Sequence, residues 1–184
     1  MKAFHLERRV RKRQQQGSDE VRELSEPGGV ERYRKGVYTM TRGDHAVSIF
    51  SEGYNCAQSV LFVFSDDVGI TRDTALRIAS GFGGGIGRMQ EVCGAVTGGI
   101  MVIGARYGRG EGDDREASGI AYAKTRELMC RFAERHGSYC CGTLLNGCGL
   151  LTEEGRKAYS DKGLFTSVCT PCVRSVVDIL EHII

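Results

Sequence analysis

The chain has 184 residues, a net charge of +2, no tryptophan and 41% hydrophobic residues. That length corresponds to one domain with a short appendage, and the hydrophobic fraction is sufficient for a core. The balanced charge gives no reason to expect a nucleic-acid partner, and no apolar run reaches the ~18–20 residues of a membrane span.

The eight cysteines are the most informative part of the composition. The amino terminus carries charges but no apolar stretch, so it does not match a secretory signal. We therefore expect a cytoplasmic protein. In that reducing compartment structural disulfides are rare, and clustered thiols indicate metal or redox chemistry.

The first 40 residues differ from the rest of the chain. Residues 1–36 contain ten Lys/Arg and six Asp/Glu, which leaves 15 basic and 17 acidic groups elsewhere. No aromatic residue lies between Arg8 and Arg13, as a surface that stacks nucleic-acid bases would require. We predict a charged, solvated N-terminal arm over residues 1–40, partly helical or disordered.

Residues 41–184 show helical spacing of apolar residues almost throughout. In chain order, we expect helices over 44–51, 55–67, 73–80, 92–107, 113–136 and from 171 to the end of the chain. Asp44, Asn55 and Thr71 are the expected caps of the first three helices, and Gly137 ends the fifth. The expected fold is all-α, a single-domain bundle of about five to seven helices with a Cys/Gly-rich loop over 138–149.

Three of the expected helices have distinctive faces. Gly94/Gly98 and Ala95/Gly99 form a strip of small residues that lets another backbone approach closely, either within the chain or in a homo-oligomer. The helix over 113–136 and the last helix each have an apolar stripe. Their members are Ile120, Ala121, Leu128 and Phe132, and Val173, Val176, Val177, Leu180 and Ile184.

The glycine run over 81–87 does not match a nucleotide-binding loop. In a G-x-G-x-x-G motif that starts at Gly83 and Gly85, the third glycine would fall on Arg88, and the run follows a helix instead of a strand. The four histidines are scattered. We interpret His136 as a charge partner for the C-terminal end of its helix.

Cys56, Cys93 and Cys172 each fall in the first turn of an expected helix. Unpaired backbone N–H groups and the helix dipole favour a thiolate there and lower the pKa of a thiol. Each of these cysteines also lies in register with the apolar face of its helix. We therefore expect the three to face a common interior, where they would form a site.

The remaining cysteines allow a second interpretation. Cys169 and Cys172 form a CxxC pair, which suits metal chelation or a reversible disulfide. Together with Cys141 and Cys148 they would supply four thiolates to a structural zinc ion. The protein would then be a zinc-binding adaptor without redox activity. Cys130 falls on the polar side of its helix and has no expected role.

Several segments together resemble the family of redox-active proteins named for the pattern C_GCAxxG_C_C. The segments are Gly53–Gln58, Ala79–Gly87, Cys93–Gly98, Cys141 with Leu144 and Leu145, and Cys172 with Val176. The resemblance covers about residues 42–184. One departure is that Gly94 directly follows Cys93, where the pattern has alanine. Cys140 and Cys169 are the alternatives to Cys141 and Cys172 for the third and fourth cysteines of the pattern.

The resemblance implies a helical protein with redox-active cysteines or an iron–sulfur or other metal centre. It extends to the non-haem domain of split-Soret cytochromes, which implies electron transfer to a partner protein of unknown identity. On this basis we expect Cys56, Cys93, Cys141 and Cys172 to converge, because four thiolates match the ligand count of an iron–sulfur cluster.

Without a metal, the same residues would act as an exchanging dithiol in an oxidoreductase or electron-transfer component. Cys93 is then the expected nucleophile, with Cys56 or Cys141 as the thiol that resolves the mixed disulfide. Gly83, Gly84 and Gly85 would form the wall of the cofactor or partner site.

Overall fold

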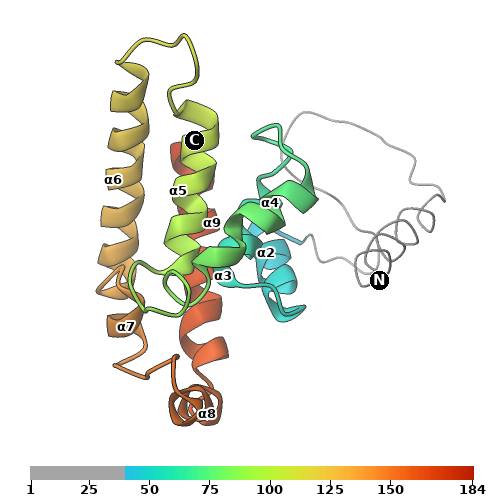
Figure 1. Cartoon of the computed structure of the whole chain (residues 1–184), viewed down its shortest axis with the longest axis vertical. Helices are drawn as coiled ribbons and strands as arrows, with labels where there is room; N and C mark the ends of the chain where they lie inside the picture. The colour runs from blue at the N-terminus through green and yellow to red at the C-terminus, as the bar shows by residue number, and fades with distance from the viewer. Residues whose placement is uncertain (1–39) are drawn as a thin grey trace, which may run out of the picture.

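The computed structural model describes residues 40–184, and all of the regular structure in that range is helical (Figure 1). The α-helices are α2 (Arg42–Ser51), α3 (Cys56–Val63), α4 (Arg72–Ala79), α5 (Gly94–Tyr107), α6 (Ala117–His136), α7 (Cys141–Leu144), α8 (Glu153–Asp161) and α9 (Thr170–Ile183). A 3-10 turn, Ser80–Phe82, follows α4, and a π-helical segment, Phe165–Cys169, leads into α9. The all-α prediction is confirmed. The predicted arm, apart from Met40, lies outside the described residues.

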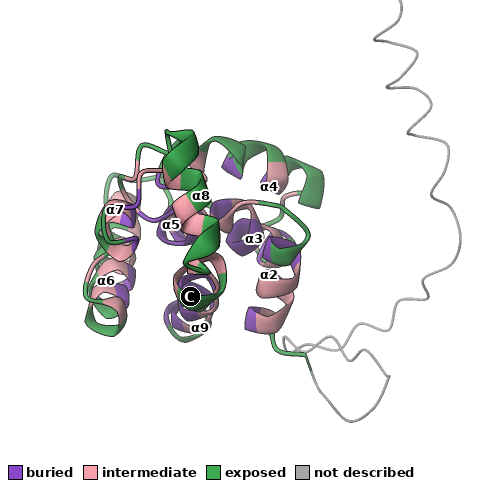
Figure 2. Cartoon of the chain, turned by 90° about the horizontal axis from the view of Figure 1, so that it is seen from below, coloured by how far each residue is buried: buried purple, intermediate pink, exposed green. Residues whose placement is uncertain are grey.

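Helices α5 and α9 form the centre of the bundle. Helix α6 packs on both of them, and the shorter α2 and α3 pack on their other side, with α4 covering α3 (Figure 1). The buried positions of the helices face one another across this arrangement (Figure 2). Helix α8 lies at the end of the bundle where α9 begins.

Local capping explains where the first three helices start. Asn55 accepts hydrogen bonds from the backbone of α3, and Thr71 accepts one from that of α4, as predicted. The predicted cap of α2 is wrong by three residues. Thr41 caps this helix, and Asp44 is the third helical residue, whose carboxylate accepts a hydrogen bond from the Thr41 backbone N–H in a capping box.

The small-residue strip of α5 is an internal contact. A Cβ atom at Gly98 would lie 2.7 Å from the Ala57 carbonyl oxygen of α3. A Cβ atom at Gly99 would lie 2.8 Å from Leu128 of α6 and 2.9 Å from Val176 of α9. The strip therefore lets three helices approach α5 closely, and it is not left free for another subunit.

The predicted apolar stripe of α9 is buried, except that Ile184 is half-buried. The stripe predicted for α6 is partly wrong. Leu128 and Phe132 are fully buried, but Ile120 is 53% exposed. At 100° per residue, Ile120 lies about 80° around the helix from Leu128, whereas Ala121 lies within about 20° of it.

The segment between α6 and α9 contains more helix than predicted. The loop expected over 138–149 includes the single turn of α7, and the polar α8 follows it. The last α-helix begins at Thr170, with Pro171 in its first turn as predicted, but the π-helical segment continues directly into it. Cys172 consequently does not lie at a free helix N-terminus, contrary to the prediction.

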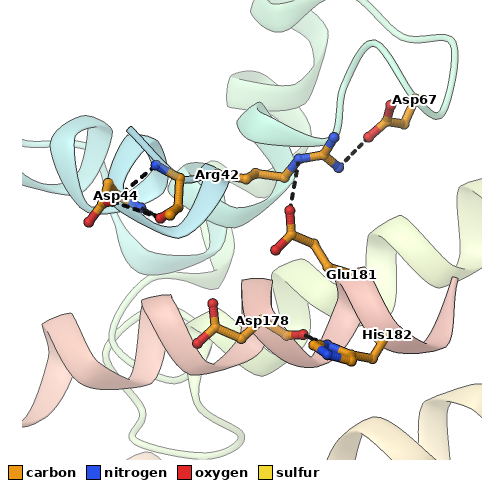
Figure 3. Close-up of polar contacts among 7 residues, drawn as sticks. Arg42, Asp44, Asp67, Asp178, Glu181 and His182 are labelled. Carbon is orange, nitrogen blue, oxygen red and sulfur yellow. Dashed lines mark hydrogen bonds and ion pairs between the residues drawn. The ribbon is translucent and has the colours of Figure 1, made fainter. Parts of the chain in front are cut away.

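Ion pairs connect α2 to the last helix. The Arg42 guanidinium lies 2.5 Å from the Asp67 carboxylate and 3.7 Å from that of Glu181 in α9 (Figure 3). Arg174 of α9 lies 2.5 Å from Asp44. These contacts fix the start of α2 against α9.

Among residues 40–184, no single helix has the length and apolar character needed to cross a membrane. Helix α8 and the segment Phe165–Ile183 meet those criteria only when taken together, and a bend of 70° separates them.

Candidate functional site

A left-handed turn forms one wall of the candidate site. Six residues between positions 84 and 90 have φ angles between +60° and +70°: Gly84, Gly85, Ile86, Gly87, Arg88 and Gln90. The N–H of Gln90 donates to the carbonyl of Gly84, and that of Glu91 to Gly85. Non-glycine residues adopt this conformation at a cost of about 1–2 kcal/mol each, so surrounding contacts must hold the turn.

Those contacts come from α7. The Cys141 N–H donates to the Glu91 carbonyl at 2.7 Å, and the Gly142 N–H donates to the Gln90 carbonyl at 2.9 Å. The Gln90 side chain donates to the carbonyl of Cys148 and accepts from the N–H of Leu150. The turn and the segment around α7 therefore hold each other in place.

The predicted glycines of the wall lie directly against the cap of α3 and the thiols. A Cβ atom at Gly83 would come within 2.7 Å of Asn55, and one at Gly85 within 2.7 Å of the Cβ of Cys141. The backbone N–H of Gly84 acts to lower the pKa of Cys56. These residues must be glycine because the turn packs against those side chains, and their role toward a cofactor stays a prediction.

Cys93 and Cys172 form a pair of neighbouring buried thiols. Cys93 is the N-cap of α5, and its N–H donates to the carbonyl of Tyr139 at 2.8 Å. The two residues are only 6% and 2% exposed. The interaction with the Cys172 thiol, together with burial, raises the pKa of Cys93 well above its ordinary value.

Cys56 lies next to this pair. It is the first residue of α3, and its sulfur occupies the space that a side chain at Gly94 would fill. Burial and the charge of the neighbouring Cys93 raise the pKa of Cys56 to about 12. Backbone N–H groups, including those of Gly84 and Ala57, oppose this shift but do not outweigh it.

Cys141 and Cys169 complete the group. Burial and the charges of Cys93, Cys56 and Cys169 raise the pKa of Cys141. The pKa of Cys169 is raised to about 11, mainly by burial, although the Tyr159 hydroxyl donates to its sulfur at 3.4 Å. We refer to Cys56, Cys93, Cys141, Cys169 and Cys172 as the thiol cluster.

All four cysteines expected to converge are therefore members of the thiol cluster, and Cys169 is a further member. The CxxC spacing indicated that Cys169 and Cys172 are close, but no pattern indicated Tyr159. Of the adjacent pair, Cys141 belongs to the cluster, whereas the Cys140 thiol donates to the Gln90 carbonyl at 3.4 Å. Cys130 is exposed, as predicted.

The prediction that helix N-termini lower the thiol pKa values is wrong for Cys56 and Cys93. Burial removes the water that would solvate a thiolate, and neighbouring thiolates repel one another. At Cys140, by contrast, hydrogen bonds from the backbone and side chain of Thr143 lower the pKa. Cys140 is not part of the cluster, so the repulsion among clustered thiols does not dominate there.

Metal ligation by these cysteines stays a prediction. In the part of the chain that the structure describes, no three His, Cys, Asp or Glu side chains are grouped so that they could hold an ion. This applies both to the iron–sulfur set and to the zinc set, in which the Cys148 thiol donates to the Gly155 carbonyl. The side chains as they lie do not fit a metal centre.

His136 has a different role from the one expected at the end of α6. Its Nδ1 atom lies 3.9 Å from the sulfur of Cys172, and its ring stacks on Phe132 with centroids 4.5 Å apart. Its Nε2 atom is buried without a hydrogen-bond partner. Burial and the charge of Arg135 lower its pKa, so the imidazole is neutral at pH 7.

His136 also lines a pocket of about 460 Å³ where α6, α7 and the start of α9 meet. The polar and charged side chains around it are Arg135, Ser138, Thr143, Asn146 and Ser167. The thiol cluster thus has a histidine between one of its members and an opening to solvent. Sequence reasoning missed this contact because 36 residues separate His136 from Cys172.

Comparison with known proteins places these features in a family. The chain is 28% identical over 119 residues to an uncharacterized protein of Archaeoglobus fulgidus, covering 61% of this chain and 79% of that protein. No solved structure matches the chain. The family model described as "Putative redox-active protein (C_GCAxxG_C_C)" matches residues 54–183, which include the whole thiol cluster. The chain therefore belongs to the C_GCAxxG_C_C family of redox-active proteins.

Proposed function

We propose that Cys93 and Cys172 cycle between a dithiol and a disulfide, and that the protein is a two-electron thiol oxidoreductase or electron-transfer component. The observation that carries this proposal is that the two thiols are neighbours and both are buried in the core, where Cys172 is the first cause of the raised pKa of Cys93. Oxidation joins the two sulfurs and releases two electrons and two protons. The pairing differs from the sequence-based expectation, in which Cys56 or Cys141 was the partner of Cys93.

The environment of the pair supports a redox role. Both thiols are removed from water, and the raised pKa of Cys93 keeps it a thiol at neutral pH. A disulfide carries no charge and needs no hydration, so burial does not penalise the oxidised form.

The proposal includes a cytoplasmic location, where cellular thiols would keep the resting pair reduced. Its redox partner is a protein or small molecule that accepts two electrons. The left-handed turn and α7 form the wall of the cluster, and we assign them the role of keeping the five thiols at fixed positions.

The test is to map the disulfide. Protein purified anaerobically is oxidised with a glutathione redox buffer, quenched in acid, alkylated and digested with trypsin. We expect a cross-link between the peptides 89–106 and 163–174, with fragmentation assigning Cys172 as the partner of Cys93. Cys148→Ser is the matched control, because Cys148 is a buried cysteine outside the cluster and its loss should leave the cross-link unchanged.

The same sample tests the metal predictions. A colourless sample without stoichiometric metal that forms the Cys93–Cys172 cross-link supports the proposal. Random pairing, or no pairing, contradicts it. A brown sample with broad visible absorption would replace it with the iron–sulfur centre, and a colourless sample with one bound zinc per chain would replace it with the zinc adaptor.

A further inference from the structure

The buried thiol pair has very little contact with solvent through which it can release protons. Cys93 is 6% exposed and Cys172 is 2% exposed, and oxidation of the pair must release two protons. A proton acceptor in contact with one of the sulfurs is therefore needed. Such a group must also have access to water, or the proton would remain buried beside the site.

His136 meets both requirements. Its Nδ1 atom lies 3.9 Å from the Cys172 sulfur, which is within hydrogen-bonding range for sulfur, and the residue lines the pocket between α6, α7 and α9. Stacking on Phe132 fixes the ring in this position. In the neutral tautomer that can accept a proton at Nδ1, the ring N–H is at Nε2, and this buried atom has no hydrogen-bond partner that would hold the ring in the other tautomer.

We infer that His136 is a catalytic residue of the proposed thiol chemistry, accepting the proton of Cys172 and passing it to the leaving group of the oxidant, which reaches the site through the adjacent pocket. This inference rests on the proposed function. It makes Cys172 the attacking thiol and Cys93 the resolving thiol, whereas Cys93 was the nucleophile expected from the sequence.

The surroundings of His136 favour the neutral base that this role requires. Arg135 on its own helix is the charged group beside it, and Cys172 is the titratable group that faces it from α9. The pocket side chains from the α7 region and from the segment before α9 are uncharged. Because the pKa of His136 is lowered from 6.5, the ring is free to accept a proton at neutral pH.

Hydrogen peroxide, a small two-electron oxidant, is the probe for this reaction. The Cys172 proton moves to His136, the thiolate attacks one peroxide oxygen, and the O–O bond breaks. The leaving hydroxide takes the proton from His136 and becomes water. Cys93 then attacks the Cys172 sulfenic acid, the S–O bond breaks, and the second hydroxide leaves as water with the proton of Cys93.

The experiment measures the rate at which peroxide forms the Cys93–Cys172 disulfide in the full chain, by quenched mass spectrometry. His136→Ala removes the base and extends the pocket. His136→Phe also removes the base but keeps a ring to stack on Phe132. We expect both variants to react about tenfold or more slowly than wild type at pH 7, as expected for the loss of a general base.

Added imidazole separates a chemical role from a structural one. We expect imidazole to restore most of the rate of His136→Ala, where the removed ring leaves room for it. It should have no effect on His136→Phe, whose ring fills the space, or on wild type. The reduction potential of the pair should be the same in all three proteins, because a base changes the rate and not the end states.

Wild-type rates in both variants would overturn the inference. A slow His136→Ala protein that imidazole does not restore would also overturn it, since the histidine would then only support the local packing. Failure of wild type to form the Cys93–Cys172 disulfide under any oxidant is a different result. It would contradict the proposed function itself.

Discussion

The sulfur of Cys56 lies against the backbone of Gly94, in the space that a side chain at that position would occupy. Gly94 directly follows Cys93, so this contact holds the start of α3 against the start of α5 at the thiol cluster. The glycine is also where the chain departs from the family's named pattern. The physical reason for glycine at this position is the close approach of the Cys56 sulfur.

Gly94→Ala tests this relationship. The new methyl group would collide with the Cys56 sulfur and lie 2.9 Å from the Phe82 carbonyl oxygen, so we expect a loss of about 1–3 kcal/mol in the free energy of unfolding. Urea denaturation measures the effect. Gly104→Ala in the same helix is the control, because nothing lies within 4 Å of a Cβ atom there and alanine is the better helix former. Equal effects of the two substitutions would contradict the account.

The thiols should differ sharply in their reaction with iodoacetamide. The thiolate is the reactive form, and Cys140 combines partial exposure with a lowered pKa. Cys56 has a pKa of about 12, so its thiolate fraction at pH 8 is about 10⁻⁴. We expect Cys140 to be alkylated well before Cys56 in the reduced protein, as followed by peptide mass spectrometry with short labelling times. Equal alkylation rates would show that burial and mutual repulsion do not control the reactivity of the cluster thiols.

Tyr159→Phe tests the hydroxyl at the edge of the thiol cluster. The Tyr159 hydroxyl stabilises a thiolate at Cys169 by donating a hydrogen bond to its sulfur. Its removal should raise the pKa of Cys169 further and slow the alkylation of this cysteine at pH 9–10. The rate at Cys140 should not change. A faster alkylation of Cys169, or a similar decrease in the alkylation rates of Cys169 and Cys140, would argue against a specific hydrogen bond.

Asp44→Asn tests the contact between α2 and α9. The pKa of Asp44 is lowered from 3.8, first by the hydrogen bond from the Thr41 side chain and also by Arg174. The carboxylate therefore stabilises the fold at pH values above its unfolded pKa, and this contribution is lost as the pH falls through its lower folded pKa. At pH 7 we expect the variant to be less stable by about 1 kcal/mol.

The difference between wild type and Asp44→Asn should shrink when urea titrations are repeated between pH 5 and pH 3. Asp73→Asn serves as the control. Asp73, in the first turn of α4, forms an exposed ion pair with Arg77 and should contribute less to the free energy of unfolding. A difference for Asp44→Asn that does not depend on pH would exclude the charged carboxylate as its cause.

The helix boundaries that the sequence predicted well are those set by local interactions. Asn55 and Thr71 cap their helices by bonding to backbone groups two or three residues away, and Gly137 ends α6 with a φ of +79°. The α8 helix was missed because its residues are mostly polar and give no apolar stripe. Its start at Thr152 is nevertheless marked by a cap.

The membership of the site was only partly predictable. The cysteines and glycines identified four members of the thiol cluster, but which thiols pair depends on how α5, α9 and α7 pack. The helix N-terminus at Cys93 predicts the wrong direction for the pKa of this thiol, because burial and the interaction with Cys172 outweigh the helix dipole. The contact of His136 with Cys172 likewise depends on tertiary packing, so no spacing in the sequence indicates it.

The most direct measurement is a redox titration of the reduced full chain in which each cysteine pairing is quantified by peptide mapping at every potential. A single two-electron transition that converts Cys93 and Cys172 together into one disulfide, with Cys130 and Cys148 remaining free thiols, is the predicted result. Loss of these two thiols at different potentials, or into mixed pairings, would contradict the proposed redox pair.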